Sequence, residues 1–308
     1  MKGIWYDGEK AVYRTDIPVP ERGMGESLIK IIYAAVCSTD REILKGYRPS
    51  FRGVMGHEFV GTVESSDNPF LVGKRVVGEI NENCGECLYC RTGRPHHCSF
   101  RRTPGLSRDG CFAEYMVLRD DMLHIVPDTL PSERAVFTEP LAAAYEITRQ
   151  VKIEEGMPVA VIGDGRLALC IANVMHLSKA DLTVIGKHRD KLSLFSSLGR
   201  TAETAETEGY EVVIEAVGNP SGIETALRAV RKKGTIVLKS TYASKASIDL
   251  SAVVVNELTL VGSRCGPFEP ALDALSSSSV VLPPLEKHAL SDYEAAFTSH
   301  AFKAGFEM

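Results

Sequence analysis

The sequence predicts a two-part α/β protein, with a mostly β first part and a second part in which strands and helices alternate. Two observations lead to this prediction. Before about Glu139 no helical period runs through the chain, and short apolar stretches are separated by Gly and Pro turns. From Val151 onward, apolar strand-like runs alternate with segments of helical periodicity. This alternation implies right-handed βαβ units and a parallel sheet covered by helices on both faces.

Length and composition agree with that organisation. A chain of 308 residues with 44% hydrophobic content can form two domains with full cores. A formal charge of −5 gives no basic surface that would favour nucleic acid or anionic membranes. The N-terminus lacks the apolar core of a signal peptide, and no apolar run approaches bilayer length. We therefore expect a cytoplasmic protein that binds neither nucleic acid nor membranes.

In the first part, the run LIKIIYAAV at 28–36 predicts a buried strand that leads to Cys37. Ser38 or Thr39 can then cap a short helix that ends at Gly46. The pattern predicts three further strands, in MGHEFVGTV, RVVGEI and FAEYMVL.

A four-cysteine loop with the spacing C-x2-C-x2-C-x7-C follows, and its thiols are Cys84, Cys87, Cys90 and Cys98. Four thiolates at this spacing can close a tetrahedral zinc site with no open position. The alternatives are disulfides or free packed thiols, which a reducing compartment and so short a polar loop disfavour. We predict a structural zinc site. His96 and His97 are interpreted as neighbours of the metal site, and the isolated Cys111, Cys170 and Cys265 as packed thiols.

The second part predicts strands in PVAVIGDG, LTVIG, EVVIEAVG, TIVLK and LTLVG, and helices at 167–179, 189–199 and 221–234. Its first turn, from Gly163 to Ala168, has the form G-x-G-x-x-A between a strand and a helix. That is the dinucleotide fingerprint of a Rossmann domain, in which the helix N-terminus binds the pyrophosphate. After this domain we expect a short final helix at 291–305.

The end of the second Rossmann strand predicts the cofactor. NAD sites usually place Asp or Glu there to bind the ribose 2′-hydroxyl, whereas this strand ends in Gly186 followed by Lys187, His188 and Arg189. The basic residues can pair with a 2′-phosphate, so the sequence predicts a preference for NADP over NAD. The alternative is that they are solvated turn residues.

The stretch from Cys37 to Glu58 combines a thiol, a hydroxyl, an imidazole and several carboxylates. Such groups can bind zinc and move a proton from a bound hydroxyl. By themselves, an apolar-flanked Cys and a loop His are more often core and surface residues than metal ligands. The motifs CSTD, GHEFVGTV, DGCFAEY, FTEPLAAA and GDGRLA, together with the four-cysteine loop, decide between these readings, because they match a known family in the same order. The chain resembles the zinc-dependent medium-chain dehydrogenases, closest to the polyol and glucose dehydrogenase-like members.

The resemblance implies a GroES-like β-rich catalytic domain over 1–150 and a Rossmann domain over 151–279, with a tail from about 280 to 308 packing back on the first. It implies that Cys37 and His57 bind a catalytic zinc, with Glu58 nearby and Glu139 of the EPL motif as the third protein ligand. Asp40 would orient the ligand histidine, and Thr39 would bind the substrate oxygen and begin a proton relay. The implied cofactor contacts are Gly163, Gly165, Arg166, Leu167, Gly186, Lys187, His188, Arg189, Val217 and Gly218.

Two departures from the family pattern affect the substrate prediction. Many members have a His five residues after the ligand cysteine, where this chain has Glu42, and Ser38 replaces the usual Gly. The run CSTDREI is closer to aldose dehydrogenases. The expected activity is therefore a hydride transfer between NADP or NAD and a secondary alcohol, polyol or sugar, with Glu42 as a candidate relay residue.

Three alternatives stay open at this stage. They are a biosynthetic carbonyl reductase of the same family, a catalytically inactive cofactor-binding paralogue with a regulatory or scaffolding role, and a zinc-free quinone reductase, which both metal sets disfavour. The resemblance further implies two zinc ions per subunit and a homodimer or homotetramer, with LTLVGSRCG as a candidate intersubunit strand.

Overall fold

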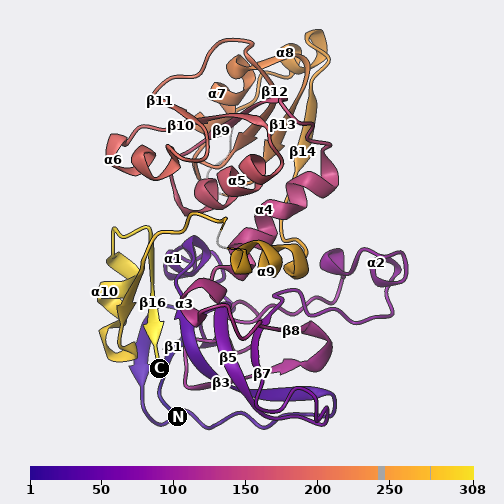
Figure 1. The fold of residues 1–308 in the computed structure, drawn as a ribbon. Helices are drawn as coiled ribbons and strands as arrows, with labels where there is room; N and C mark the ends of the chain where they lie inside the picture. Colours follow the sequence, from indigo (N-terminus) through magenta and orange to yellow (C-terminus); the bar gives the residue numbers. More distant parts are fainter. Residues whose placement is uncertain (242–246, 278) are drawn as a thin grey trace. The chain divides into compact units, whose positions relative to one another are not determined.

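The computed structural model describes residues 1–241, 247–277 and 279–308 (Figure 1). The chain forms two compact units. The first comprises Met1–Glu139, Leu272–Ser277 and Pro284–Met308, and the second comprises Pro140–Ala271 and Ser278–Pro283. The division predicted at residue 150 falls at the end of helix α4 (Thr138–Gln150), whereas the units divide in the first turn of that helix.

The first unit is built on a seven-stranded sheet in the order β15-β16-β3-β5-β6-β8, with β7 also paired to β3. All its pairings are antiparallel except β15 with β16. The strands are β3 (Glu26–Ala35), β5 (Glu58–Ser65), β6 (Arg75–Gly78), β7 (Tyr115–Arg119), β8 (Leu123–Ile125), β15 (Leu285–His288) and β16 (Lys303–Glu307). A three-stranded sheet, β2-β1-β4, adds β1 (Gly3–Tyr6), β2 (Ala11–Arg14) and β4 (Gly53–Val54).

Short helices complete this unit between the strands. They are α1 (Ser38–Leu44), α2 (Leu88–Arg91), η1 (Pro95–His97), η2 (Asp120–Met122), α3 (Ser132–Ala135), η4 (Leu290–Asp292) and α10 (Tyr293–Thr298). Its core contains a trio of edge-to-face aromatic rings. The Phe112 and Phe306 centroids lie 5.0 Å apart, and Phe297 lies 6.0 Å from Phe112.

The helix predicted at 291–305 is wrong in its second half. Helix α10 ends at Thr298, and Lys303–Glu307 form strand β16. Gly305 pairs with Ala35 of β3, and Phe306 is fully buried in the aromatic trio. This pairing and burial involve residues far away in sequence, so they override the local helical pattern.

The second unit is a six-stranded parallel sheet in the order β11-β10-β9-β12-β13-β14, which confirms the predicted doubly wound fold. Helix α5 lies on one face and α7 on the other (Figure 1). The strands are β9 (Pro158–Ile162), β10 (Asp181–Ile185), β11 (Arg200–Ala202), β12 (Tyr210–Glu215), β13 (Val230–Leu238) and β14 (Thr259–Gly262). The helices are α5 (Arg166–Leu177), α6 (Arg189–Leu192), η3 (Ser193–Phe195), α7 (Ser221–Ala229), α8 (Leu250–Val255) and α9 (Phe268–Ser276), which belongs to the first unit from Leu272 onward.

Three details of this unit differ from the prediction. The helix expected at 189–199 is a short α6 followed by the 3-10 turn η3. The helix expected to end at Gly234 ends at Ala229, because Val230 is buried and pairs with Tyr210 of β12. The edge strand β11 was not predicted, since three mostly exposed residues carry no apolar pattern.

Candidate functional site

Strand register brings the first set of predicted metal donors together. In the antiparallel pair of β3 and β5, Ala35 lies opposite Glu58. Cys37 comes two residues after Ala35 and His57 one residue before Glu58, so the three donors meet at one end of the strand pair. One donor atom from each of Cys37, His57 and Glu58 lies within 4.8 Å of the other two. His57 and Glu58 are buried, and Cys37 is half-buried.

Asp40 positions two of these donors. It is fully buried in the first turn of α1, where its Oδ2 accepts a hydrogen bond of 2.8 Å from the backbone N–H of Cys37. Its Oδ1 lies 3.5 Å from His57 Nδ1, and neither atom has a hydrogen-bond partner of normal geometry among the described residues. With Nδ1 turned towards a carboxylate, Nε2 is the ring nitrogen available to a metal, as in carboxylate–histidine–zinc arrangements. The donor set therefore fits zinc.

Electrostatics around His57 are dominated by anionic neighbours. Burial disfavours the charged imidazolium, but the Asp40 carboxylate and the Cys37 thiol outweigh it and raise the pKa of His57 well above its ordinary value. A cation is therefore favoured at this point, either a proton on the ring or a metal ion beside it. A bound metal replaces that proton because only the neutral imidazole can act as a ligand.

Glu58 has a cationic partner that sequence reasoning missed. Its Oε2 accepts a hydrogen bond from Nζ of Lys303 on β16, and both side chains are at most 3% exposed. The ammonium also lies 5.9 Å above the ring of Phe137. The one available signal was a lysine inside the apolar run AFKAGF, but the predicted helix hid its strand position. Glu58 is therefore a charge-paired carboxylate.

Thr39 and Glu42 lie along the same short helix. Thr39 Oγ1 is 3.7 Å from Cys37 Sγ, so the hydroxyl is beside the donor group. Glu42 pairs with Lys45 at 2.8 Å and its side chain is 36% exposed. Glu139 lies in the first turn of α4 and, among the described residues, is not a member of the Cys37 group. Its predicted role as third ligand stays a prediction.

The four-cysteine loop forms a second donor set. Its four Sγ atoms all lie within 4.8 Å of one another, with separations of 3.5 Å for Cys87–Cys90 and for Cys84–Cys98. A tetrahedron with Zn–S bonds of about 2.3 Å has edges of about 3.8 Å, so this spacing suits zinc. Backbone N–H groups of Cys90 and Ser99 lower the pKa of Cys87 to about 6, whereas burial and the neighbouring thiols raise the pKa of Cys90 to about 12.

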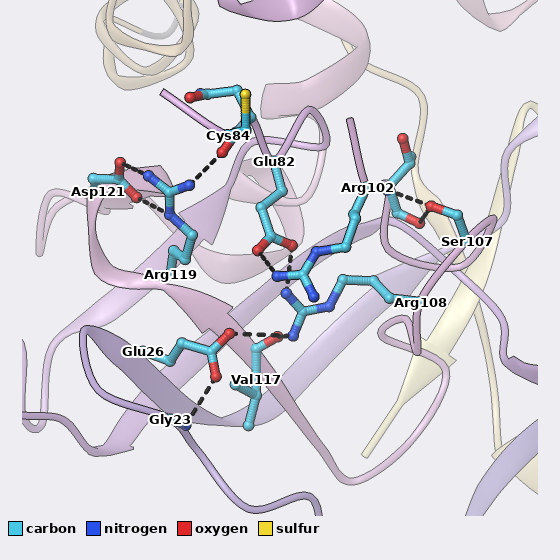
Figure 2. Close-up of polar contacts among 12 residues, drawn as sticks. Gly23, Glu26, Glu82, Cys84, Arg102, Ser107, Arg108, Val117, Arg119 and Asp121 are labelled. Carbon is cyan, nitrogen blue, oxygen red and sulfur yellow. Dashed lines mark hydrogen bonds and ion pairs between the residues drawn. The ribbon is translucent and has the colours of Figure 1, made fainter. Parts of the chain in front are cut away.

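A buried carboxylate anchors the base of this loop. Glu82 is 2% exposed, and its two oxygens accept hydrogen bonds from Arg102 and Arg108, as Figure 2 shows. Backbone hydrogen bonds in both directions also join Glu82 to Arg102. The two ends of the loop are thereby held together independently of the thiols.

The second unit contains a cavity of about 730 Å³ at the dinucleotide fingerprint. Seven residues that line it are predicted or adjacent cofactor residues, namely Gly163, Asp164, Gly165, Gly186, Lys187, His188 and Val217. The predicted Arg166, Leu167, Arg189 and Gly218 do not line it. Arg189 instead pairs with Glu203, and the N–H of Gly218 donates to Ser240 Oγ at 2.8 Å. Gly163 has φ +129°, and a Cβ there would lie 2.6 Å from Ala216 O, so the turn needs glycine.

Asp164 ties the fingerprint turn to the end of the second strand. Its Oδ2 accepts hydrogen bonds from the backbone N–H groups of Lys187 and His188 and contacts His188 Nδ1 at 2.9 Å. Burial would raise the pKa of Asp164, but the hydrogen bonds from His188 and Lys187 outweigh it and lower the pKa. A Cβ on Gly186 would lie 2.7 Å from this oxygen, so an acid at position 186 would disturb the turn.

Comparison with known proteins agrees with this geometry. Residues 23–128 match the alcohol dehydrogenase GroES-like domain, and residues 167–277 match the zinc-binding dehydrogenase family. The chain is 30% identical to a sorbitol dehydrogenase of Halalkalibacterium halodurans, over 94% of this chain and 91% of that protein. It belongs to the zinc-dependent medium-chain alcohol dehydrogenase superfamily.

Two further proteins also match over almost the whole of this chain and of their own length. The chain is 31% identical to an L-threonine 3-dehydrogenase of Escherichia coli K12, over 94% of this chain and 93% of that protein. A zinc-binding dehydrogenase structure from Sinorhizobium meliloti 1021, solved with NADP, superposes with a TM-score of 0.92 at 24% identity over 100% of this chain and 99% of that one. The predicted family and fold are thus confirmed. Membership supports an alcohol or polyol oxidoreductase that uses zinc and a nicotinamide cofactor.

Two remaining expectations concern packing and membranes. Cys111 and Cys170 are buried, as packed thiols would be, and Cys265 is half-buried. Within the described ranges, no helix has the length and apolar character needed to cross a bilayer.

Proposed function

We propose that this protein is a zinc-dependent dehydrogenase that transfers hydride between NADP(H), in preference to NAD(H), and a secondary alcohol, polyol or sugar hydroxyl. The observation that supports this most is the mixed donor set of Cys37, His57 and Glu58, with Asp40 behind His57 and the Thr39 hydroxyl beside Cys37. A thiolate, an imidazole and carboxylates that leave an open position are typical of catalytic zinc sites, whereas four thiolates are typical of structural ones.

Zinc bound here would act as a Lewis acid that lowers the pKa of a substrate hydroxyl. Cys37 and His57 would hold it, and Asp40 would keep the His57 ring in the required orientation. We propose Glu139 as the third protein ligand, because Glu58 is already neutralised by Lys303 and is the poorer donor. Thr39 would accept the proton from the substrate hydroxyl as it passes its own proton outward. Glu42, paired with Lys45 at the surface, is the proposed next group in that relay.

The NADP preference is supported by the second-strand turn. The acid that normally binds a ribose 2′-hydroxyl is absent at Gly186, and Lys187, His188 and Lys191 line the cavity. The Asp164 carboxylate is nearby, but three donors from residues 187 and 188 already occupy its Oδ2. Asp164 therefore holds the turn of Lys187 and His188 in place.

Two zinc ions per subunit and a homodimer or homotetramer complete the proposal. Two donor groups support the zinc count. Strand β14 is an edge of the six-stranded sheet, and the neighbouring α8 exposes Leu250, Val254 and Val255 by 66 to 79%. An unpaired edge next to exposed apolar side chains favours pairing with a second copy. A cytoplasmic location stays a prediction from the sequence.

The proposal is tested by assaying zinc-loaded protein against secondary alcohols, polyols and aldoses, with NADP and NAD in parallel. We expect turnover of at least one class, with a higher kcat/KM for NADP. A reductase would show the same zinc content but far faster turnover of carbonyl substrates with NADPH. No turnover in either direction by protein that carries two zinc ions would favour the non-catalytic paralogue instead.

A further inference from the structure

Strand β12 ends in a buried acid that the proposed mechanism does not use. Glu215 is the last residue of this strand and is 1% exposed. In the sheet, β12 lies beside β9 on the side opposite to β10. A doubly wound sheet has two mononucleotide-binding halves, and the acid that binds the adenosine ribose in NAD sites belongs to the β10 half. Glu215 therefore belongs to the half that takes the nicotinamide nucleotide.

The carboxylate of Glu215 orders the turn that follows β12. Its Oε1 accepts hydrogen bonds from the backbone N–H of Val217 at 2.8 Å and from Ser240 Oγ at 3.0 Å. The Ser240 hydroxyl in turn accepts a hydrogen bond from the N–H of Gly218 at 2.8 Å. One carboxylate thus holds, directly or through one hydroxyl, both residues of this turn that the sequence predicts as cofactor contacts.

Glu215 also lies directly behind the wall of the cofactor cavity. Ala216, Val217 and Gly222 all line that cavity. Gly222 is in the first turn of α7, and a Cβ on it would lie 2.5 Å from Glu215 Oε1, so the helix packs against the carboxylate. The acid is therefore separated from a bound cofactor by the backbone of these residues alone.

The donors around Glu215 are neutral, and no Lys, Arg or His is paired with it in the described ranges. The backbone N–H of Lys239 donates to Glu215 O at 3.0 Å. The ammonium of Lys239, however, donates to Ala143 O at 2.7 Å and to Ser263 Oγ at 3.2 Å. Neutral donors offset the loss of water around the carboxylate but leave its negative charge in place.

This arrangement differs from that of the other buried acids. Glu58 is paired with Lys303, and Glu82 is paired with two arginines (Figure 2). Asp40 faces the imidazole of the catalytic donor set. Among the buried acids of the described chain, Glu215 alone has neither a cation nor an imidazole beside it. A buried charge of this kind is costly, and it favours a cation that binds nearby.

We propose that Glu215 is a positioning residue for the nicotinamide half of the cofactor and that its charge makes this half favour the oxidised form. The oxidised nicotinamide ring carries a positive charge, which uptake of a hydride removes. The phosphates, riboses and adenine are the same in both forms. A fixed anion in the wall of this half therefore stabilises the oxidised cofactor relative to the reduced one. This inference rests on the nicotinamide cofactor of the proposed function.

Calorimetric titration of the zinc-loaded protein with oxidised and with reduced cofactor tests this role. The cofactor is whichever of NADP and NAD the wild type binds more tightly. Glu215→Gln keeps an acceptor oxygen for the Val217 N–H and removes the charge. We expect Kd of the oxidised form to rise by about fivefold while Kd of the reduced form is unchanged. Glu211→Gln is the matched control, because Glu211 is on the same strand, pairs with Arg231 and does not line the cavity.

Two further variants separate charge from positioning. Ser240→Lys leaves Glu215 in place but sets a cation beside it, so the ratio of the two Kd values should rise as in Glu215→Gln. It serves as the test if Glu215→Gln fails to fold, which circular dichroism shows. Glu215→Asp keeps the charge on a shorter side chain, so it should weaken both forms alike and leave the ratio unchanged.

The ratio of the two Kd values decides the inference. A role in folding or turn geometry alone would weaken both forms equally. Equal weakening in Glu215→Gln, or an unchanged ratio in Ser240→Lys, therefore overturns the assignment. Binding needs no turnover, so a protein that binds both forms but converts no alcohol would contradict the proposed function without affecting this result.

Discussion

The two donor sets of the first unit differ in the types of their ligands, in the elements that supply them and in their exposure to solvent. The four-cysteine set uses four identical ligands from one loop, and three of them are partly or fully exposed to solvent. The Cys37 set takes its donors from the ends of β3 and β5 and surrounds them with buried Asp40 and Lys303. Local, identical thiolates close a coordination shell, whereas mixed donors among buried charges leave a position for a substrate. The contrast is the one expected between a structural and a catalytic zinc site.

The largest expected difference between the two donor sets comes from removing one thiol from each. Cys37→Ala is expected to abolish turnover and to leave one zinc ion per subunit in the folded protein. Cys90→Ala is expected to release the other zinc ion and to lower the thermal midpoint, since a structural metal contributes folding free energy. Zinc analysis, activity and circular dichroism on both variants check this. Full activity in Cys37→Ala would refute its assignment.

Lys303→Met should have the next largest effect. It leaves the Glu58 carboxylate buried without its ion-pair partner, which typically costs about 3–5 kcal/mol of unfolding free energy. Chemical denaturation measures this loss. Glu58→Gln in the same chain removes the orphan charge and should restore much of the stability. Lys287→Met is the control, because that lysine is 34% exposed and its pair with Glu133 lies at the surface. Equal losses for both lysines would contradict the buried ion pair.

Asp40→Asn is expected to weaken zinc binding at the Cys37 set and not at the four-cysteine set. The backbone contact to Cys37 can persist through the amide oxygen, but the negative charge beside His57 Nδ1 is lost. Loss of such a partner typically lowers metal affinity by about 10–100-fold. Competition with a chelator, read as zinc per subunit, should show the catalytic zinc leaving first while the four-cysteine zinc stays. Simultaneous loss of both ions would argue that Asp40 acts on folding alone.

Lys187→Ala tests the cofactor cavity of the second unit and has the smallest expected effect. If Lys187 pairs with the 2′-phosphate, KM for NADP should rise by about tenfold while KM for NAD is unchanged. Arg189→Ala is the matched control, because Arg189 is bound to Glu203 and does not line the cavity. We prefer this test to an acid at position 186, which would clash with Asp164. An unchanged NADP/NAD ratio in Lys187→Ala would contradict the predicted preference.

Elements with strong local signals were predicted well. The strand before Cys37 and the fingerprint turn are set by apolar periodicity and glycine, which act over a few residues. The short helix after Cys37 was also expected, but its N-cap is Cys37, whose N–H donates to Asp40, and not Ser38 or Thr39. The errors occur where pairing with a segment far away in sequence decides the secondary structure. Lys303–Glu307 became a strand because β3 was available to pair with it, and helix α7 ended early because β12 bound Val230.

Sequence alone determined the four-cysteine site and the dinucleotide turn, because every group they need lies within one short segment. Only the tertiary structure showed that β3–β5 register gathers Cys37, His57 and Glu58, that Lys303 neutralises Glu58, and that Arg102 and Arg108 turn to Glu82. The physical reason is that burial and charge pairing depend on which distant segments meet, and this is a property of the packed chain rather than of local periodicity.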